Sequence, residues 1–459
     1  MTSKTNTKRR IIASPLALSA ADIFPYFAAQ QGTAILDSSL TNDLGNYTII
    51  AAVPYHTIEA DGTKVRINGM AVPDKTFTEA VNEYMQSHQD VNDTKLPIVS
   101  GAVGYVTYDY GRQKMGISSR HVKDIDIADA RLTFYDLFII ENNATHEVYF
   151  IANGETEEAS RLLQRVCRKL RQYLKLPLQP DRLSLLEEFH MTRQYTPHEY
   201  EDTVQKLIDY IVAGDVYIAN LTQRLTITSP VQPFSLFSRL RNDNPAPFSA
   251  YLNYRDCQII SSSMERFLQL RDGILETRPI KGTRPRGTTP ALDAALRQEL
   301  ADSEKDKSEL LMIVDLERND MNKVCRPGSV VVPSLFSIED YATVFHLVAT
   351  IQGQLKDGMT AMDAFDALFP GGSITGAPKY RAMEIIDELE RCRRSLYTGS
   401  IGYLTLDGAC DFNIVIRTAI HQNGTYYLGV GGGITSESVP VDEYNETMQK
   451  AKALLYALH

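Results

Sequence analysis

The sequence contains no apolar run that approaches the roughly 20 residues a membrane-spanning helix needs, so we expect no such helix. The basic N-terminus loosely resembles a signal peptide, but Ser14, Pro15 and Ser19 interrupt its apolar stretch and favour a tail that enters the fold. An excess of basic residues is also missing, because 57 acidic residues face 47 lysines and arginines and the net charge is −10. This balance argues against a nucleic-acid-binding protein, although it permits a local basic pocket for an anion.

Cysteine is scarce and follows no pattern. The five cysteines are odd in number, widely spaced and without a CxxC pair. This arrangement argues against a disulfide framework and against a zinc site. We therefore expect reduced thiols and a cytoplasmic protein.

The length of 459 residues exceeds what one typical core supports, so two domains or one large fused unit are expected. Residues 34–60 and 98–152 are rich in short strand-like runs, whereas residues 156–175 carry leucines at helical spacing. A linker signal follows at 176–181, and capping residues predict a second helix over 196–213. The resulting regions are an N-terminal α+β region over 1–155, a helical linker over 156–194 and a larger C-terminal α+β region over 195–459.

Glycines precede a predicted helix in the segment from Phe369 to Lys379. Backbone N–H groups and the helix dipole can bind an anion at such a place. Ala377 and Pro378 stand where a nucleotide-binding loop requires lysine and serine or threonine, which argues against nucleotide hydrolysis. A tight turn without a ligand fits the same residues.

Two pairs of acidic residues have helical spacing. Asp306 and Glu309 are three residues apart, as are Glu443 and Glu446, and Lys450 follows four residues later. Each pair would share one face of a helix. If the two faces converge, they would suit Mg²⁺, which binds oxygen ligands and keeps some waters. Taken singly, each pair also fits an ordinary solvated helix face.

Basic residues concentrate in the segment 277–287, where four cations lie within nine residues. The neighbouring arginines would lower the pKa of Lys281 and supply a free amine, but the same cations could bind carboxylates or face solvent. His346 lies in an apolar run, which is more typical of a core histidine. Arg417 also interrupts an apolar run and needs a partner such as a carboxylate, and glycines 431–433 follow it.

In their order and combination, these segments resemble the chorismate-utilising enzymes, a family that includes anthranilate, aminodeoxychorismate, isochorismate and salicylate synthases. The resemblance is dense from Glu265 to Lys450 and looser before it. The segments that carry it are 279–283, 311–316, 318–320, 369–379 and 443–447, with weaker similarity at 35–39 and 104–109.

Three positions differ between members of the family. Lys281 resembles the aminodeoxychorismate synthases, whereas anthranilate synthases have alanine in this motif. Ile218 stands where isochorismate-type enzymes use a lysine base and where the amine-using members usually have glutamine, which argues against hydration of chorismate. Met264 stands where proline is usual before Glu265. The resemblance therefore implies amination of chorismate to 4-amino-4-deoxychorismate, for para-aminobenzoate and folate biosynthesis.

The alternatives stay open at this point. An anthranilate synthase component I would release pyruvate, and an isochorismate or salicylate synthase would need no ammonia. A tryptophan-sensing subunit without catalysis would show no Mg²⁺-dependent turnover. The resemblance further implies an α+β fold with two large antiparallel sheets packed together and flanked by helices. Relatives bind tryptophan in the N-terminal half, and Leu36, Asp37 and Ser38 resemble the segment that lines that site.

The resemblance assigns roles residue by residue. Lys281 would be the nucleophile and Glu265 the acid, while His346 matches a residue that handles protons in the pyruvate-releasing relatives. The metal would be Mg²⁺ on Glu309 and Glu446, supported by Asp306 and Glu443. The remaining substrate-binding residues would be Ser373, Thr375, Tyr397, Arg417, Gly431, Gly432, Gly433 and Lys450.

Ammonia requires a source. A glutamine amidotransferase uses a cysteine nucleophile on a glycine-rich elbow, and none of the five cysteines has that setting. Cys410, which follows Asp407-Gly408-Ala409, comes nearest. We therefore expect a separate amidotransferase subunit as a partner, besides chorismate as substrate.

Overall fold

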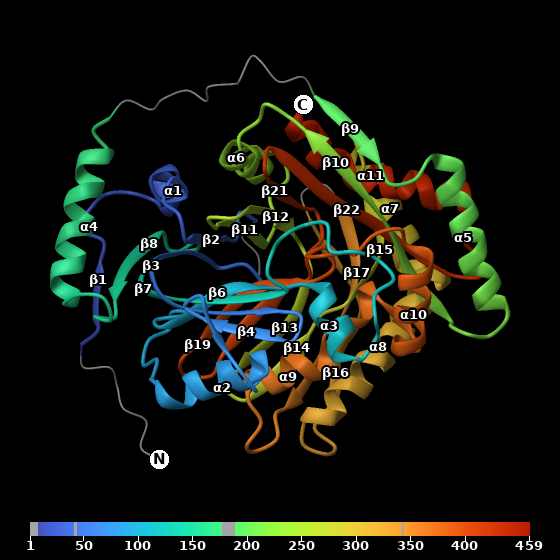
Figure 1. The fold of residues 1–459 in the computed structure, drawn as a ribbon. Coiled ribbons are helices and arrows are strands. Elements are labelled where there is room, and N and C mark those ends of the chain that lie inside the picture. Colours follow the sequence, from blue (N-terminus) through green and yellow to red (C-terminus); the bar gives the residue numbers. More distant parts are fainter. Residues whose placement is uncertain (1–7, 41–43, 177–188, 342–343) are drawn as a thin grey trace.

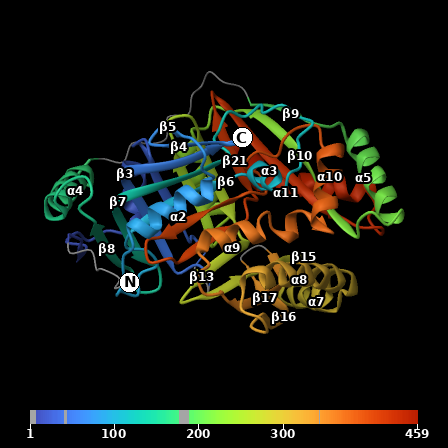
Figure 2. The same ribbon diagram turned by 60° about the horizontal axis from the view of Figure 1, so that its bottom comes forward.

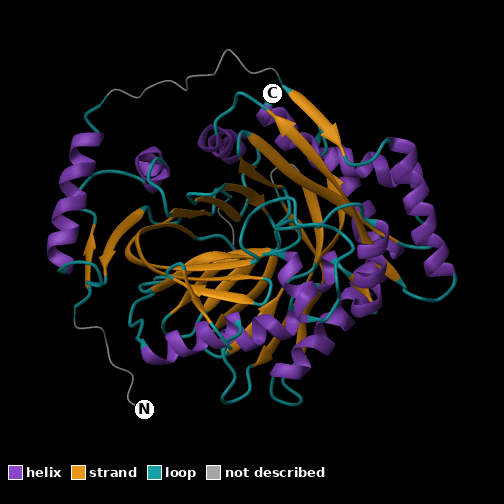
Figure 3. Cartoon of the chain, in the orientation of Figure 1, coloured by secondary structure: helices purple, strands orange, loops and turns teal. Residues whose placement is uncertain are grey.

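The computed structural model describes residues 8–40, 44–176, 189–341 and 344–459, and it has the α+β fold that the sequence predicts. Among these residues the strands form one connected 22-stranded sheet, antiparallel throughout, with helices around it (Figures 1 and 3). The two expected sheets are thus joined through hydrogen-bonded strands into one.

Eight strands come from the N-terminal region and include the two strand-rich stretches predicted from the sequence. They are β1 (Arg10–Ala13), β2 (Thr33–Asp37), β3 (Tyr47–Asp61), β4 (Lys64–Ile67), β5 (Met70–Val72), β6 (Gly101–Val106), β7 (Ala130–Asn142) and β8 (Glu147–Ala152).

The remaining strands follow the helical linker. They are β9 (His190–Arg193), β10 (Ile218–Thr228), β11 (Phe248–Asn253), β12 (Gln258–Ser263), β13 (Arg266–Arg271), β14 (Ile274–Thr277), β15 (Ile280–Pro285), β16 (Val331–Asp340), β17 (Val344–Gln354), β18 (Gly376–Ala377), β19 (Ser400–Thr405), β20 (Cys410–Asn413), β21 (Thr418–Gln422) and β22 (Thr425–Ile434).

The N-terminal strands are inserted between C-terminal ones. Strand β2 pairs with β11, so that Leu36 lies opposite Ala250, and β6 pairs with β19, so that Gly104 lies opposite Gly402. A Cβ atom on Gly104 would overlap the backbone of Arg131 in β7, and one on Gly402 would overlap that of Asp411 in β20, so both positions require glycine. Strands from both regions also share one buried apolar cluster. The division at residue 155 therefore does not separate two sheets.

Helices cover the outside of the sheet, and Figure 2 shows α7 and α8 packed beside β15 and β17. The helices are α1 (Ala20–Ala28), α2 (Phe77–Ser87), α3 (Tyr108–Lys114), α4 (Ala159–Tyr173), α5 (Pro197–Val212), α6 (Pro233–Asp243), α7 (Pro290–Asp302), α8 (Glu304–Val324), α9 (Ala361–Leu368), α10 (Lys379–Leu389) and α11 (Pro440–Leu458), with a 3₁₀ turn η1 (Gly372–Ile374).

Two helices confirm the sequence patterns directly. Helix α4 follows the leucine spacing predicted for the linker region, although residues 177–188 of that linker lie outside the described residues. Helix α5 begins behind Thr196, whose hydroxyl accepts from the backbone of Glu199 while the Glu199 carboxylate accepts from Thr196 in return. This capping box satisfies backbone donors that would otherwise be unpaired. Of the helices in the described ranges, none is both long and apolar enough to cross a membrane.

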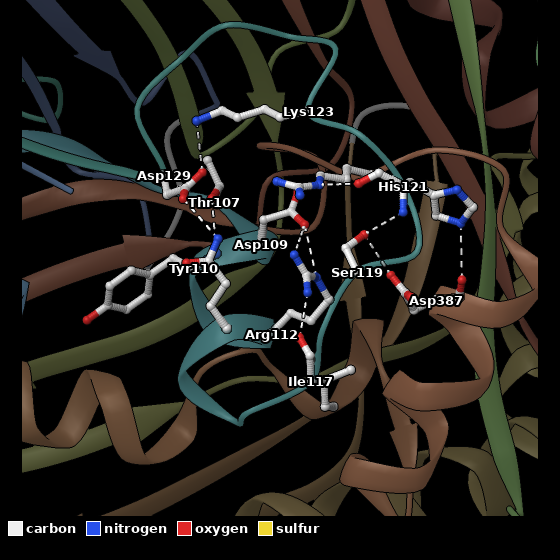
Figure 4. A network of polar contacts seen from close by, with 12 residues as sticks. Thr107, Asp109, Tyr110, Arg112, Ile117, Ser119, His121, Lys123, Asp129 and Asp387 are labelled. Atoms are coloured by element: carbon white, nitrogen blue, oxygen red, sulfur yellow. Dashed lines mark hydrogen bonds and ion pairs between the residues drawn. The ribbon is translucent and has the colours of Figure 1, made fainter. Parts of the chain in front are cut away.

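The loop between α3 and β7 binds the N-terminal region to α10. In Figure 4, Ser119 and His121 approach Asp387 of α10. The Ser119 hydroxyl donates to Asp387 at 3.0 Å, the backbone N–H of Arg120 donates to its other oxygen at 2.9 Å, and a ring nitrogen of His121 lies 3.1 Å from its carbonyl. Helix α10, which begins just after the glycine loop, is therefore held from outside by the N-terminal region.

Candidate active site

A cavity of about 680 Å³ lies among β15, β17, β22, α8 and α11. Its volume is within the range of about 300–1,000 Å³ that ligand pockets occupy. The predicted site residues that line it are Glu265, Lys281, Asp306, Glu309, His346, Ser373, Tyr397, Arg417, Gly431, Gly433, Glu443, Glu446 and Lys450. Thr375 and Gly432 do not line it, and the Thr375 hydroxyl instead donates to the carbonyl oxygen of Gly371 at 2.8 Å.

Lys281 and Glu265 meet at Ser373 of the glycine loop. The Lys281 amine donates to the carbonyl oxygen of Ser373 at 3.1 Å, and the Ser373 hydroxyl donates to Glu265 at 2.7 Å. Burial lowers the pKa of Lys281, while the nearby carboxylates of Glu309 and Glu265 oppose that shift. Burial likewise raises the pKa of Glu265, against the Ser373 hydrogen bond and the charge of Lys281. Both shifts favour the neutral forms, a free amine beside a carboxylic acid.

The cause of the Lys281 shift differs from the sequence-based prediction. None of the three arginines of the segment 277–287 is among the main causes of the pKa shift, and each is paired with a carboxylate. Arg278 pairs with Glu339, Arg284 with Glu299 and Asp306, and Arg286 with Asp293. Burial dominates instead, and the like charge that adds to it comes from Lys450.

Each acidic pair shares one helix face, as its spacing predicts, and the two pairs converge on the cavity from α8 and α11, as the family resemblance implies. Burial raises the pKa values of Glu309 and Glu443, and the negative charge of Glu446 raises both further. Burial also acts on Glu446, but Lys450, at 2.6 Å, outweighs it and lowers the pKa of that carboxyl. Asp306 differs from the others, because it pairs with Arg284 at 3.2 Å.

These carboxylates partly fit a divalent cation. Mutual repulsion among Glu309, Glu443 and Glu446 is the charge pattern that a cation would relieve. A Cβ atom on Gly432 would lie 3.2 Å from Glu443 and 3.5 Å from Glu446, so glycine leaves the space between them open. Within the described part of the chain, however, no three acidic, histidine or cysteine side chains gather into a ligand set. These carboxylates therefore suit an ion that takes only some of its ligands from the protein and keeps several waters, as Mg²⁺ does.

Arg417 also brings a positive charge to the cavity. Burial lowers the pKa of its guanidinium, and no carboxylate among the described residues pairs with it. Its backbone has a φ of 49°, a left-handed conformation that is uncommon for arginine. A half-buried guanidinium without a carboxylate partner is costly, and a bidentate carboxylate would satisfy it. In this cavity that carboxylate has to come from a ligand.

Glycines of β22 let the cavity wall approach its side chains. A Cβ atom on Gly433 would lie 3.2 Å from the Lys281 amine and 3.4 Å from Ile218, and one on Gly429 would overlap the ring of Tyr397. Lys450 donates to the carbonyl oxygen of Gly431 at 2.9 Å. The side chain of Ile218 therefore lies close to the Lys281 amine. It is apolar, whereas the lysine or glutamine expected at this position in relatives would be polar.

His346 lies in the cavity instead of the core, although it is only 3% exposed. Thr283 contacts its Nδ1 at 2.9 Å, and the sulfur of Met264 lies 2.7 Å from its Nε2. Burial lowers its pKa to about 3, and the positive charges of Arg417 and Lys450 act in the same direction. The imidazole is therefore neutral at physiological pH.

The geometry agrees with the similarity to known proteins. The family described as "chorismate binding enzyme" matches residues 33–456. The chain belongs to this family. Aminodeoxychorismate synthase component 1 of Salmonella typhimurium is 42% identical over 80% of this chain and 78% of that protein. Anthranilate synthase component 1 of Aquifex aeolicus is 37% identical over 84% of this chain and 79% of that protein.

The fold is confirmed by a solved member of this family. The crystal structure of anthranilate synthase component I from Streptococcus pneumoniae TIGR4 has a TM-score of 0.80 at 30% identity, and the match covers 90% of this chain and 93% of that one. The family resemblance stated from the motifs is thus confirmed over nearly the whole chain, including the N-terminal region where the motifs are weaker.

Two polar residues of this family member escaped the sequence analysis. Asn220 lines the cavity, and its buried side-chain oxygen has no hydrogen-bond partner in the described structure. Glu317 on α8 is fully buried, accepts from the Thr277 hydroxyl at 2.8 Å, and has a pKa raised to about 8 by burial. A charged residue between two apolar helix positions was the available signal for Glu317, whereas an asparagine in a strand gives none.

The predicted tryptophan segment lines a second, smaller cavity of about 80 Å³. Leu36, Asp37 and Ser38 lie there beside Pro247 and Phe248. Burial raises the pKa of Asp37, which pairs with Arg241 at 2.9 Å.

Proposed function

We propose that this protein replaces the C4 hydroxyl of chorismate by an amino group, giving 4-amino-4-deoxychorismate, the activity that its relatives named aminodeoxychorismate synthase component 1 carry in their name. The observation that carries the proposal is the Lys281 amine, which lies in the cavity on the carbonyl of Ser373, while the Ser373 hydroxyl holds Glu265, whose pKa burial raises.

The cavity offers complementary charge for both carboxylates of the substrate. Arg417 supplies a guanidinium without a carboxylate partner among the described residues, Lys450 supplies an ammonium, and both line the cavity. Such a local reversal of charge is necessary, because the chain as a whole carries a net charge of −10. Tyr397, fixed against Gly429, fits the enolpyruvyl end next to Arg417.

The proposed reaction uses Lys281 and Glu265 twice. The free amine of Lys281 attacks C2 of the ring while Glu265 donates its proton to the C4 hydroxyl, which leaves as water. Ammonia then attacks C4, the bond between C2 and the Lys281 nitrogen breaks, and the proton released by the new amino group returns to Glu265. Chorismate and ammonia thus become aminodeoxychorismate and water, and the enolpyruvyl group is retained.

Glu309, Glu443 and Glu446 would hold Mg²⁺, with Asp306 behind them in its pair with Arg284. When bound, the ion would neutralise the ring carboxylate of the substrate. Without it, three acidic groups would repel that carboxylate, and only the lysines nearby, Lys281, Lys305 and Lys450, would offset them.

Ammonia would come from a separate glutamine amidotransferase. All five cysteines are free, and four of them are buried. Burial raises the pKa of Cys410, the nearest candidate in sequence, to about 12, which is the opposite of an activated nucleophile. The relatives are called component 1, which fits an enzyme of more than one subunit. We place both subunits in the cytoplasm, where the free thiols stay reduced.

Products formed from chorismate, Mg²⁺ and ammonium at alkaline pH, identified by mass spectrometry, test the proposal. Wild type should give aminodeoxychorismate without pyruvate. Lys281→Ala should form at least about 10²-fold less of this product. Lys323→Ala, which removes an exposed lysine paired with Asp320, is the matched control and should behave as wild type.

Other outcomes select the alternatives. If the wild-type protein releases pyruvate together with anthranilate, it catalyses the anthranilate synthase reaction and Lys281 takes no part in it. Turnover that needs no ammonia would indicate isochorismate chemistry, and no Mg²⁺-dependent turnover would leave a non-catalytic subunit.

A tryptophan ligand at Leu36, Asp37 and Ser38 stays a prediction. The cavity of about 80 Å³ would have to open for an indole, since ligand pockets usually exceed about 300 Å³. The chain contains no tryptophan, so the fluorescence of added tryptophan can be followed without background. Binding should shift its emission to shorter wavelength, and Asp37→Asn should weaken the shift. An unchanged spectrum would remove tryptophan as a ligand.

A further inference from the structure

The sulfur of Met264 lies against Nε2 of His346. The two residues come from distant segments, and both line the main cavity. Met264 is 4% exposed, and its sulfur lies 2.7 Å from Nε2 of His346. On the other side of the ring, the Thr283 hydroxyl lies 2.9 Å from Nδ1, and the ring of Tyr341 packs edge-on at 5.1 Å. The imidazole is therefore enclosed at both nitrogens.

The thioether blocks Nε2 in either tautomer. If Nε2 carries the proton, that proton points at the sulfur, which can accept it weakly and cannot pass it on. If Nδ1 carries the proton, the free lone pair of Nε2 is covered by the same sulfur atom. In both cases a ring atom of a substrate cannot reach Nε2 while Met264 stays in place. No other histidine lines this cavity among the residues that the structure describes.

The aminated product contains a step that such a nitrogen could catalyse. A base that takes the proton from C4 of aminodeoxychorismate makes the C3–O bond break, and its electron pair leaves with the enolpyruvyl group. The imidazolium then returns the proton to the methylene carbon, so that pyruvate leaves and the ring becomes aromatic para-aminobenzoate. Atoms and charge balance without any further reactant. An enzyme that keeps the enolpyruvyl group must withhold its bases from C4.

We propose that Met264 is a specificity-determining residue, whose sulfur covers Nε2 of His346 and thereby stops the enzyme after amination, before pyruvate is eliminated. This inference rests on the proposed function, because it concerns the fate of the aminated ring. It also gives a physical role to a residue that departs from the proline expected before Glu265. A proline side chain closes back onto its own backbone nitrogen and is too short to reach the imidazole of His346.

The test measures pyruvate released per aminated product, for the whole chain with chorismate, Mg²⁺ and ammonium. Wild type should give a ratio near zero. Met264→Ala uncovers Nε2 and should raise the ratio at least about tenfold, a modest part of the 10²–10⁴-fold that a positioned base typically contributes. Met264→Leu refills the same space with carbon and should stay close to wild type. The double variant Met264→Ala, His346→Ala should return to the wild-type ratio.

Two results would overturn the inference. One is a Met264→Ala enzyme that aminates chorismate and still releases no more pyruvate than wild type. The other is a rise in pyruvate that persists when His346 is also replaced. If Met264→Ala no longer aminates, preformed aminodeoxychorismate is supplied, and pyruvate release from it decides the question in the same way.

A second measurement separates this inference from the proposed function. Deuterium exchange at the imidazole carbon between the two ring nitrogens, followed by mass spectrometry, reports access to His346 without any turnover. Exchange at His346 should be several-fold faster in Met264→Ala than in wild type, and unchanged in Met264→Leu. Equal rates in all three proteins would show that Met264 does not cover the ring, whereas a wild type that fails to aminate chorismate would overturn the proposed function alone.

Discussion

Ser373 joins Lys281 to Glu265: its carbonyl oxygen accepts from the lysine amine at 3.1 Å, and its hydroxyl donates to the glutamate at 2.7 Å. One residue of the glycine loop thus positions both the amine and the acid of the proposed reaction. Because the backbone holds the amine and the side chain holds the acid, a substitution of Ser373 can disturb Glu265 and leave Lys281 in place.

Ser373→Ala should change the pH profile in one direction. The hydrogen bond from Ser373 stabilises the charged form of Glu265, so its loss raises the pKa of a group whose pKa burial already raises. Glu265 acts as an acid, and activity falls as pH rises through its pKa. The descending limb of kcat/KM against pH should therefore move to higher pH, with kcat lowered by about tenfold.

Thr375→Ala is the matched control for this change. It also removes a buried loop hydroxyl, but that hydroxyl donates to Gly371 and does not face the cavity. We expect a loss of about 1 kcal/mol in stability and no shift of the descending limb. A profile for Ser373→Ala that coincides with that of Thr375→Ala would contradict the assignment of Glu265 as the acid.

Arg417→Met should make the free protein more stable and weaken its affinity for chorismate. The guanidinium is half-buried and has no carboxylate partner in the described structure, so its removal relieves a desolvation cost of about 1 kcal/mol. Thermal unfolding without substrate should shift to higher temperature. The KM for chorismate should rise by about 10²-fold, because a buried charge-assisted contact is lost.

Arg326→Met serves as the control, since Arg326 forms an exposed ion pair with Asp357. That variant should change neither quantity measurably, because exposed pairs contribute little. If Arg417→Met destabilises the free protein, then the guanidinium has a structural partner and is not reserved for a ligand.

Sequence patterns predicted local features of the fold well. The capping signals before α5 and the leucine spacing of α4 are contained within a few neighbouring residues. Helix α5 begins directly behind the predicted cap, and α4 (Ala159–Tyr173) lies within the predicted stretch 156–175. The pairing of β2 with β11 joins residues more than 200 positions apart, and no local pattern specifies such a register. For the same reason a division by sequence at residue 155 could not reveal that the strands interleave.

The candidate site shows the same limit. Residue types and their order brought Lys281, Glu309 and Glu446 to one cavity correctly. The direction of a single side chain was not predictable, so Thr375 was placed among the substrate-binding residues although its hydroxyl donates back to the loop. The pairing of Arg284 with Asp306 was likewise hidden, because it depends on how α8 packs against β15.

Mg²⁺ should stabilise the protein through Glu309. The pKa values of Glu309 and Glu443 are raised in the fold, so the Mg²⁺-free protein loses stability as pH rises through them, and a cation should restore it. A hundredfold excess of Mg²⁺ over its Kd should add about 2.7 kcal/mol, seen as a higher Tm. Glu309→Gln should raise the Tm without Mg²⁺ and reduce the Mg²⁺-dependent shift.

Glu304→Gln is the control on the same helix, because the Glu304 side chain is exposed and pairs with Lys307 at its start. Its Mg²⁺-dependent shift should equal that of wild type. An undiminished shift in Glu309→Gln would mean that the ion binds elsewhere, and the absence of any shift in wild type would argue against Mg²⁺ at this site.

Asp387→Ala should weaken the contact between the N-terminal loop and α10. The carboxylate accepts from the Ser119 hydroxyl at 3.0 Å and from the backbone of Arg120 at 2.9 Å (Figure 4), and both donors would lose their partner. We expect a loss of about 1–3 kcal/mol in the free energy of unfolding by urea. Asp387→Asn should fall between wild type and Asp387→Ala, since its amide can replace only one of the two acceptor oxygens.

The kinetic constants separate this structural role from a catalytic one. Asp387 lies outside the cavity, so kcat and KM measured well below the unfolding transition should match those of wild type in both variants. Glu384→Ala, on the same helix, removes only a half-exposed pair with Arg381 and should cost under about 1 kcal/mol. If Asp387→Ala were no less stable than Glu384→Ala, the Asp387 contact would not hold α10, and the inserted strands with contacts such as that of α2 with α9 would keep the two regions together.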